Sequence, residues 1–544
     1  MKACRTVHLN YRKVCPWNAA RIFLSFSLAL LLFSPAILWA QDMNILHHDL
    51  TVTIHPEHHE LMAEDTLKLK RGTHDPSIPI RLLLNPTLIV KEVRIDDRRV
   101  PFKEPEQESH STTQGSHTQD HLSRMIEINQ PPSSNQRTQM MVTIVYQGTI
   151  NDPPRRSPGL RFVRPDTTMG HIGPQGVYLS SETHWYPDVP GRSLATFTVH
   201  ATVPKQWEVV TQGREMSRRS LPDRLTTEWQ VYAKSEALTL VANHFVKQQR
   251  DWNGINLATY LFPEDAHLAE TYLTATARYL TMYQQLLGRY PFPKFAVVEN
   301  FFPSGLGLPS FTLLGNRVIK RRYIQPYALG HELVHSWFGN AVFNDFSKGN
   351  WVEGLTTYLS NYYYEERHRS PKDTAAQRRR MMMEYSLYTR PETDYALRQF
   401  HHKETQQDNA IGYQKAAMVF HMLRRELGDQ FFFRGIRFLA ATQKGRYVDW
   451  NDLEDIFERT SRQSLQWFFE QWVDRPGAPL IQIKNFQVQR DAQGPTQFLV
   501  RVHIAQQGRP YRLSLPASLM VDESSIFHTT LKLEKAEQTF TIPL

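Results

Sequence analysis

Two histidines and a glutamate within residues 329–340 are the side chains of this 544-residue chain best suited to hold and use a metal ion. His331 and His335 are four positions apart, so on a helix they lie on one face, one turn from each other. Two imidazoles at that spacing can share a zinc ion, and Glu332 lies on the neighbouring side, where it can reach a water molecule. Because the chain has 23 histidines, an H-E-x-x-H pattern can also arise by chance, and the surrounding sequence has to support it.

A third ligand follows in the sequence. Glu353 comes 18 positions after His335, in a W-V-E-G segment that precedes a helix predicted over residues 355–364. A catalytic zinc takes three protein ligands and keeps a fourth position open, and two histidines with one glutamate are a standard set. The spacing therefore predicts one zinc ion per chain, held by His331, His335 and Glu353.

Hydrophobic periodicity divides the rest of the chain into three parts. Apolar residues alternate from about residue 49 to about residue 247, which predicts strands. Helical periodicity begins with residues 264–287 and returns after Pro326, Gly354 and Tyr413. Alternation resumes after Pro479. We expect a multidomain α+β protein with an N-terminal all-β domain at 41–247, a mainly helical domain at 248–475 and a short C-terminal β-sandwich at 476–544.

The first 40 residues predict export. A basic stretch precedes the apolar run 22–38 and then Ala40, a pattern typical of a secretory signal cleaved after that alanine. The apolar run can also nearly span a bilayer, so an uncleaved membrane anchor is the alternative. We expect a periplasmic or extracellular protein if the segment is cleaved and a membrane-anchored one if it is not. Cys4 and Cys15 precede the run, so a cleaved chain has no disulfide and no thiolate ligand.

The net charge of +9 does not indicate nucleic-acid binding. Residues 1–41 contain five basic residues and no acid, which leaves +4 for the remainder of the chain. No basic run in that remainder is typical of a nucleic-acid-binding stripe, and its polar segment 103–121 is typical of a solvated loop. We expect no nucleic-acid partner.

The segments H-E-L-V-H-S-W-F-G-N and W-V-E-G together resemble the gluzincin metallopeptidases of the aminopeptidase N and leukotriene hydrolase type. Residues 411–419, I-G-Y-Q-K-A-A-M-V, are similar to the Y-x-K-G-A segment of that family. The resemblance implies a thermolysin-like catalytic domain that hydrolyses peptide bonds, with His331, His335 and Glu353 as its zinc ligands. It also implies that Glu332 is the general base and that Tyr413 donates a hydrogen bond to the developing oxyanion.

The chain departs from the family pattern at three places. Glu353 is one residue closer to His335 than in the family, and Ala416 replaces the glycine of Y-x-K-G-A. The G-x-M-E-N strand, whose glutamate binds the free amine of a substrate, corresponds here to G-L-G-L-P-S at residues 305–310. Pro309 stands where that glutamate is expected.

This last departure shapes the functional prediction. By the resemblance, substrate is bound by the G-L-G-L-P-S strand and by Glu182, which would be the remaining amine-binding carboxylate. We expect an exported aminopeptidase-like metallopeptidase with altered amine recognition, acting on peptides or proteins, with the strand near Phe311 pairing with the substrate backbone. An endopeptidase on the same zinc site, a lipid-processing hydrolase and a non-catalytic binding protein are the alternatives. The strand residues assigned to substrate binding are Gly305, Gly307, Pro309 and Ser310.

Overall fold

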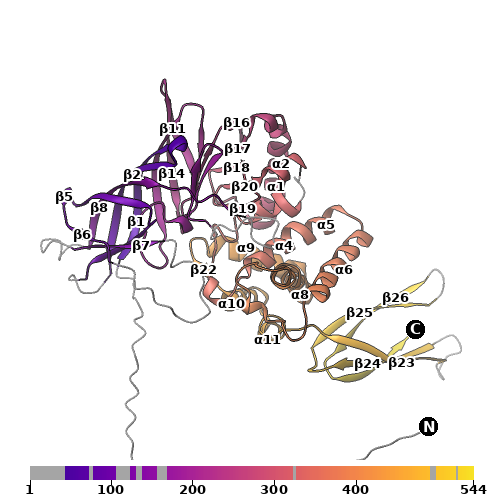
Figure 1. Ribbon diagram of the computed structural model, residues 1–544. Coiled ribbons are helices and arrows are strands. Elements are labelled where there is room, and N and C mark those ends of the chain that lie inside the picture. The colour runs from indigo at the N-terminus through magenta and orange to yellow at the C-terminus, as the bar shows by residue number, and fades with distance from the viewer. Residues whose placement is uncertain are drawn as a thin grey trace, which may run out of the picture. The chain divides into compact units, whose positions relative to one another are not determined.

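The computed structural model describes residues 43–72, 78–105, 123–129, 138–155, 168–322, 326–490, 498–521 and 525–544. The predicted signal or anchor at 1–40 lies outside these ranges, as does most of the predicted loop at 103–121. The chain divides after Ala40 into two units, and the second, Gln41–Leu544, contains every element labelled in Figure 1. Within the described ranges, no helix is long and apolar enough to cross a membrane.

An eight-stranded sheet forms most of the N-terminal part (Figure 1). Its strand order is β13-β14-β11-β1-β2-β8-β4-β5, and β1 pairs in parallel with β11 and antiparallel with β2. Alternate side chains of β1 are buried, among them Leu50, Val52 and Ile54, because one face of the sheet covers the core. The strands are β1 (Met43–His55), β2 (Glu60–Arg71), β4 (Leu88–Ile95), β5 (Arg98–Arg99), β8 (Gln139–Thr149), β11 (Ala195–Pro204), β13 (Arg214–Ser220) and β14 (Arg224–Ser235).

Two smaller sheets complete this all-β part. One has the order β12-β15-β10-β9 and the other the order β3-β7-β6. The strands are β3 (Ile80–Leu84), β6 (Phe102–Lys103), β7 (Arg124–Ile128), β9 (His171–Gly173), β10 (Gly176–Leu179), β12 (Glu208–Val210) and β15 (Leu240–Asn243).

A five-stranded sheet begins at Val246 and has the order β16-β17-β18-β20-β19. Its strands β17, β18 and β20 are parallel, and helix α1 (Ala269–Leu287) connects β17 to β18. Helix α1 stops at Gly288, whose φ of 94° favours glycine. The strands are β16 (Val246–Trp252), β17 (Ile255–Leu261), β18 (Lys294–Asn300), β19 (Gly305–Leu308) and β20 (Phe311–Gly315).

The position of β20 corrects one expectation. The strand that begins at Phe311 is hydrogen-bonded to β18 on one side and to β19 on the other, so it has no free edge for a substrate backbone. The edge strand on this side of the sheet is β19. Sequence alternation identifies strands but does not reveal which of them lies at an edge.

Helices follow the sheet up to Trp472, with one small two-stranded sheet between them (Figure 1). Their buried residues join one large core with the residues of α1 and of the five-stranded sheet. The elements are α2 (Asn316–Lys320), α3 (His331–Val334), β21 (Phe343–Asn344), α4 (Val352–Thr357), α5 (Tyr363–His368), α6 (Pro371–Tyr388), α7 (Gln406–Asp408), α8 (Ala416–Leu427), α9 (Asp429–Thr442), β22 (Tyr447–Val448), α10 (Trp450–Ser461) and α11 (Gln466–Trp472).

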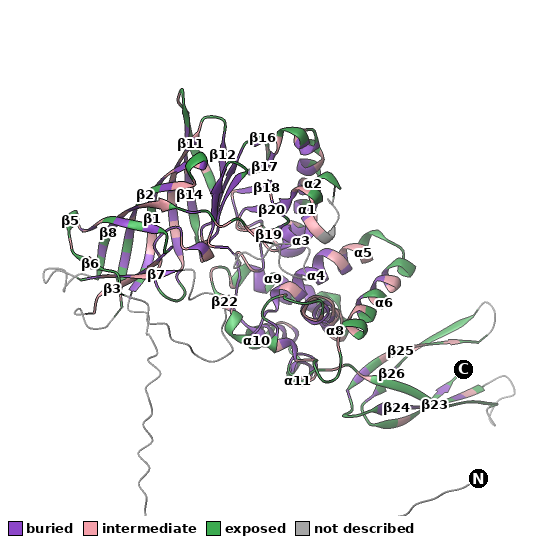
Figure 2. Ribbon diagram, in the orientation of Figure 1, coloured by how far each residue is buried: buried purple, intermediate pink, exposed green. Residues whose placement is uncertain are grey.

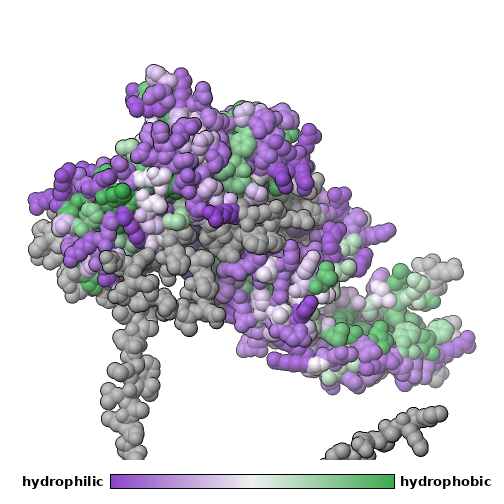
Figure 3. Space-filling view, viewed as in Figure 1, coloured by the Kyte–Doolittle hydropathy of each residue, from purple (hydrophilic) through white to green (hydrophobic). Residues whose placement is uncertain are grey.

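The C-terminal part consists of two small sheets, β23-β24-β27 and β25-β26. The alternating residues of β23 predicted an inward face, yet every residue of this edge strand is exposed, including Ile483 at 63% and Val488 at 54% (Figure 2). Figure 3 shows apolar side chains gathered over these strands. The strands are β23 (Leu480–Arg490), β24 (Phe498–Gln507), β25 (Leu513–Met520), β26 (Ile526–Leu533) and β27 (Glu537–Pro543).

The predicted fold class is confirmed. The chain is a multidomain α+β protein in which an all-β N-terminal part precedes a mainly helical part and a short β module. The predicted catalytic residues fall on the helices between Pro326 and Leu427, and the predicted substrate strand lies at the edge of the five-stranded sheet.

Candidate active site

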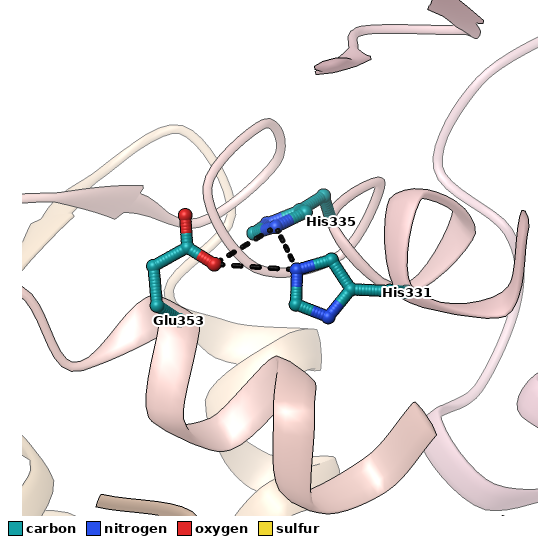
Figure 4. A group of neighbouring side chains, drawn as sticks. All are labelled: His331, His335 and Glu353. Atoms are coloured by element: carbon teal, nitrogen blue, oxygen red, sulfur yellow. Dashed lines mark hydrogen bonds and ion pairs between the residues drawn. The ribbon is translucent and has the colours of Figure 1, made fainter. Parts of the chain in front are cut away.

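The structure brings His331, His335 and Glu353 together (Figure 4). The Nε2 atoms of the two histidines are 3.2 Å apart, and Oε2 of Glu353 lies 3.3 Å from Nε2 of His331 and 3.5 Å from Nε2 of His335. Within the described ranges, this is the group of three or more His, Cys, Asp or Glu side chains that could hold a metal ion. His331 and His335 lie in and at the end of α3, Glu353 lies in α4, and β21 and a short 3-10 helix, Phe346–Lys348, lie between the two helices in sequence.

The donor set fits zinc in both chemistry and spacing. Ligand atoms about 2.0–2.1 Å from a tetrahedral zinc lie roughly 3.3–3.4 Å from one another. The three measured separations, 3.2, 3.3 and 3.5 Å, are close to that value. Two imidazole nitrogens and one carboxylate oxygen also leave one tetrahedral position open, which is the arrangement of catalytic zinc sites.

The second nitrogen of each imidazole is directed to a fixed partner. Nδ1 of His335 lies 3.1 Å from the backbone oxygen of Phe338. Nδ1 of His331 lies 3.5 Å from Oγ of Ser360, which itself donates to the backbone oxygen of Thr356. Such partners hold a ligating ring in orientation, so both Nε2 atoms point to the same place.

The charges in the group favour a bound cation. Burial acts to raise the pKa of Glu353, but the charges and hydrogen bonds of His335 and His331 outweigh it and hold the pKa well below its usual value. Burial acts to lower the pKa of His335, but the charge and hydrogen bond of Glu353 raise it to about 9. A carboxylate that stays ionised beside two imidazole nitrogens is suited to binding a cation.

Glu332 lies beside the three ligands and against the edge strand. Its side chain is buried, and burial raises the pKa of its carboxyl, while the charges of His331 and His335 oppose that rise. A Cβ atom added to Gly307 of β19 would lie 2.9 Å from Oε2 of Glu332, and one added to Gly305 would lie 3.5 Å from Oε1. The glycines therefore let the strand approach the carboxylate closely.

Tyr413 lies over one of the ligands. Its ring stacks on that of His331 with centroids 6.2 Å apart and planes 19° apart. Burial raises the pKa of its hydroxyl well above the usual value, and the charge and hydrogen bond of Glu353 raise it further. Tyr413 lies in a π-helical segment, Asn409–Lys415, and the segments Pro326–Gly330 and Tyr358–Tyr362 around the site are also π-helical. Such segments occur frequently at functional sites.

The packing of α4 on α8 explains one departure from the family pattern. A Cβ added to Gly354 would lie only 2.4 Å from Cβ of Ala416. The two helices therefore approach so closely that only one of these two positions can carry a methyl group. Ala416 is accommodated because Gly354 lies opposite it, and the helices that carry Glu353 and Tyr413 stay in contact.

The predicted substrate strand is β19 with its turn. Asn340 donates from Nδ2 to the backbone oxygen of Gly307 at 3.0 Å, which joins the strand to the loop after α3. Pro309 and Ser310 form the two-residue turn to β20, beyond the position that faces Glu332. Ser310 has a φ of 72°, and its buried hydroxyl accepts a hydrogen bond from the N–H of Gly213. The position of this strand that faces the carboxylate is Gly307.

The interactions described for Glu182 are with residues outside the metal-binding group. It belongs to a short 3-10 helix, Ser181–Thr183, and Oγ of Ser181 donates to its Oε2 at 3.1 Å. Its charge acts on Tyr186 and on Glu236, and it is not among the main charges acting on Glu332 or Glu353. The structure thus brings Gly305 and Gly307 next to Glu332, whereas the partners described for Glu182 and Ser310 lie outside the metal-binding group.

Two residues of the site could not be predicted from any motif in the sequence. Lys403 places its ammonium 4.3 Å from the centre of the Tyr413 ring, and its charge acts on Glu332. Asn350 accepts from the backbone N–H groups at the start of α4 and holds the loop before Lys403. Neither residue has a motif or a characteristic spacing, and only the folding of distant segments onto one another reveals them.

Comparisons with known proteins agree with this geometry. Residues 317–472 match the model of the peptidase family M1 domain. Aminopeptidase 2 of Candida albicans is 24% identical over 317 residues, covering 53% of this chain and 34% of that protein. The alanine/arginine aminopeptidase of Saccharomyces cerevisiae is 22% identical over 308 residues, covering 51% and 33%. The matched region thus spans about a third of the length of these relatives.

Solved structures show the same fold. An M1 zinc metallopeptidase from Deinococcus radiodurans superimposes with a TM-score of 0.60 at 19% identity, covering 81% of this chain and 95% of that one. Native yeast LTA4 hydrolase superimposes with a TM-score of 0.61 at 16% identity, covering 81% and 69%. At these identities the likeness establishes the architecture, and the chemistry has to be argued from the residues themselves.

Proposed function

We propose that this chain, whose residues 317–472 match the peptidase family M1 domain, is an exported, zinc-dependent, aminopeptidase-like hydrolase with altered recognition of the substrate's N-terminal amine. One observation supports the proposal of zinc-dependent hydrolysis. Three ligand atoms converge within 3.2–3.5 Å of one another beside the buried carboxylate of Glu332. This arrangement has the parts that metal-assisted hydrolysis of a peptide bond requires.

His331, His335 and Glu353 would hold the metal. When bound, zinc supplies Lewis-acid chemistry, acidifying a water molecule and polarising the scissile carbonyl. Glu332 accepts the proton of the attacking water and passes it to the leaving nitrogen, a role usually worth about 10²–10⁴-fold in rate. Its burial suits this exchange, because burial raises the pKa of the carboxyl above its usual value.

In this mechanism, Tyr413 donates a hydrogen bond to the oxyanion that develops on the scissile carbonyl. Its hydroxyl is buried and stays protonated, since burial raises its pKa well above the usual value. A protonated phenol at this position donates a hydrogen bond to the tetrahedral oxyanion, where such a donor is worth most. The stacking of its ring on His331 fixes the hydroxyl relative to the metal ligands.

The backbone of β19 binds the substrate in the proposed complex. β19 is an edge strand whose position opposite Glu332 has no side chain, so an extended peptide can pair with it beside the catalytic carboxylate. All four residues of this strand, G-L-G-L, are uncharged. A free amine would thus meet no carboxylate from β19, and Glu182 is the acid that the family resemblance assigns to that task.

An endopeptidase is the second candidate, and the uncharged β19 strand favours it. The deciding measurement is kcat/KM for one peptide with a free and with an acetylated N-terminus, in the presence and absence of a chelator. We expect cleavage of both forms, lost with the chelator and restored by zinc, and a preference for the free amine below about a thousandfold, the range of one buried ionic contact. A larger preference would show that the amine site is intact, and no cleavage of any peptide would exclude hydrolysis.

Glu182→Ala distinguishes the two candidates further. If Glu182 holds the amine, the variant should lose the preference for the free N-terminus and keep its rate on the acetylated peptide. If wild type shows no preference and both rates are unchanged in the variant, Glu182 does not contact substrate and the enzyme is an endopeptidase. Glu264→Ala, which removes an exposed carboxylate, is the matched control.

Export is proposed from the sequence of residues 1–40. The signal pattern ends at Ala40, where the chain divides into its two units. N-terminal sequencing of the protein from its native host should find Gln41 as the first residue. An intact N-terminus in the membrane fraction would instead show an anchor, and a soluble cytoplasmic protein would refute export.

A further inference from the structure

Lys403 is a lysine held inside the site, although no motif includes it. Its ammonium lies 4.3 Å from the centre of the Tyr413 ring, on the residue that stacks on His331. The charges of Glu353 and Glu332 both act on it. The side chain is partly buried, and burial lowers the pKa of its ammonium, while the two carboxylates oppose that change.

The loop that carries Lys403 is fixed on its N-terminal side by the helix that carries Glu353. The N–H of Asn350 donates to the backbone oxygen of Phe400 at 2.7 Å, and Nδ2 of Asn350 donates to the backbone oxygen of His401 at 2.8 Å. Oδ1 of the same residue accepts from the N–H of Val352 at 3.1 Å. One asparagine therefore sets the distance between the start of α4 and the Lys403 loop.

The loop is fixed on its C-terminal side as well. Oδ2 of Asp408 accepts from the N–H of Glu404 at 3.0 Å and from the N–H of Thr405 at 2.7 Å. Thr405 completes a capping box at the start of α7. Because the backbone is tied at His401 and at Glu404, the fold fixes the short segment from which the Lys403 side chain reaches the Tyr413 ring.

The charges on the two sides of the site are unequal. β19 contributes no carboxylate, and the loop opposite Tyr413 contributes an ammonium. Of the two carboxylates whose charges act on Lys403, Glu353 is a metal ligand in the proposed function. A site built to receive a substrate ammonium has an excess of carboxylates, whereas this one places a fixed cation beside the residue that meets the oxyanion.

We infer that Lys403 recognises a carboxylate of the substrate close to the scissile bond, so that the preferred substrates are peptides with an anionic group there. The inference rests on the proposed function for the position of the scissile bond. Two sources supply such a group: an acidic side chain next to the bond, or the C-terminal carboxylate of a short peptide. In either case the ammonium donates a charge-assisted hydrogen bond to the carboxylate while its other side stays on the Tyr413 ring.

The experiment compares peptides that differ in one group. The parent peptide is neutral, acetylated at its N-terminus and amidated at its C-terminus. One relative exchanges Gln for Glu next to the scissile bond, and another carries a free C-terminal carboxylate one residue beyond it. The rate kcat/KM is measured for wild type, Lys403→Met, Lys403→Arg and the control Lys372→Met, which removes an exposed lysine of α6.

Wild type should prefer a carboxylate-bearing peptide over the parent by about 10- to 100-fold, the range of a charged hydrogen bond. Lys403→Met should reduce that preference to less than about threefold, whatever its rate on the neutral parent, whereas Lys403→Arg and Lys372→Met should keep the preference. The acidic relative and the free-acid relative show which source is recognised. Zinc content should be equal in all four proteins.

A second readout does not depend on turnover. Calorimetry gives the dissociation constants of the same peptides for the zinc-loaded Glu332→Gln protein, with and without Lys403→Met. A carboxylate-dependent affinity that the second substitution removes supports the inference even if no peptide is cleaved, in which case the proposed function alone fails. Equal losses on neutral and anionic peptides would instead make Lys403 a residue that positions Tyr413, and no discrimination by wild type would equally overturn the inference.

Discussion

The candidate site has a helical half and a strand half, and the two differ in how many residues they share with the gluzincin pattern that the sequence resembles. The helical half, formed by α3, α4 and the segment Asn409–Lys415, places a complete set of metal ligands with a buried carboxylate and a buried phenol. The strand half, formed by β19 and its turn, has neither an acidic side chain nor any side chain at Gly307. The difference indicates that bond cleavage imposes fixed residues, whereas substrate recognition can change while the reaction stays the same.

The largest effect should come from removing a metal ligand in the helical half. His335→Ala deletes one of three ligand nitrogens or oxygens, so zinc content should fall from about one per chain to near zero, and activity to background. Metal analysis and kcat/KM on one peptide are the measurements. His368→Ala, which removes an exposed histidine of α5, should change neither. A His335→Ala protein that keeps its zinc would place the metal elsewhere.

The next effect separates metal binding from proton transfer. Glu332→Gln should retain zinc, because Glu332 lies beside the three ligands and is not one of them. Its kcat should fall by about 10²–10⁴-fold, since an amide cannot accept the proton of the attacking water. Metal analysis and steady-state kinetics on the same sample test this. A near-normal rate in Glu332→Gln would refute the assigned general base.

A somewhat smaller loss of kcat is expected when the hydroxyl of Tyr413, the proposed hydrogen-bond donor to the oxyanion, is removed. Tyr413→Phe keeps the ring stacked on His331 and removes only the hydroxyl. The variant should lose about 10²–10³-fold in kcat with little change in KM, because the hydrogen bond strengthens in the transition state. Steady-state kinetics measure both constants, and Tyr388→Phe, at an exposed position of α6, is the control. A change confined to KM would contradict the assigned role.

Paired glycine substitutions test the strand half. A Cβ on Gly307 would lie 2.9 Å from both Oε2 of Glu332 and Cβ of His335, whereas a Cβ on Gly305 has only an ordinary contact at 3.5 Å. Gly307→Ala should therefore displace β19 or Glu332 and reduce kcat/KM by up to about 100-fold, and Gly305→Ala should leave it within about threefold. Equal rates in the two variants would mean that β19 does not set the geometry of the site.

The smallest expected effect concerns stability and a buried acid of β18, in the same sheet as β19. Glu299 of β18 accepts from the N–H of Phe262 and from Asn316, next to Asp265, and burial raises its pKa to about 7. The folded state thus holds a proton that the unfolded state releases near pH 4.5, so stability should fall as pH rises from about 4.5 to 7, by at most about 3 kcal/mol. Lys320, 3.5 Å from Asp265, reduces this effect.

Thermal unfolding between pH 4.5 and 8 measures this pH dependence. Glu299→Gln should flatten the fall in Tm, since an amide does not titrate, and should leave the kcat/KM ratio of free to acetylated peptide unchanged. Glu264→Gln, at an exposed position, should retain the wild-type profile. If Glu299→Gln instead changes the preference for a free N-terminus, an acid of β18 binds the substrate amine in place of an acid on β19.

Local sequence was sufficient for much of this protein. The four-residue spacing of His331 and His335 fixes their common face on any helix, so the ligand pair could be predicted without tertiary information. Alternation near residue 50 correctly indicated an inward-facing strand, because period and burial coincide in a sheet with one covered face. The same reasoning failed for β23, whose alternating apolar side chains are exposed, because alternation does not show whether another layer covers the strand.

Other features were decided only when distant segments packed together. The sequence placed the missing amine partner at Pro309, but the position that faces Glu332 is Gly307, since the turn begins after Leu308. Lys403 lies 50 residues after Glu353 in the chain, yet the charge of Glu353 acts on its ammonium. No sequence pattern relates the two residues. The residue types thus determined which chemistry the site can support. The approach of the β19 edge and of the Lys403 loop determined the surroundings of the candidate metal ligands. Only the tertiary structure decides those surroundings, because electrostatic and steric effects depend on distance in space and not on distance along the chain.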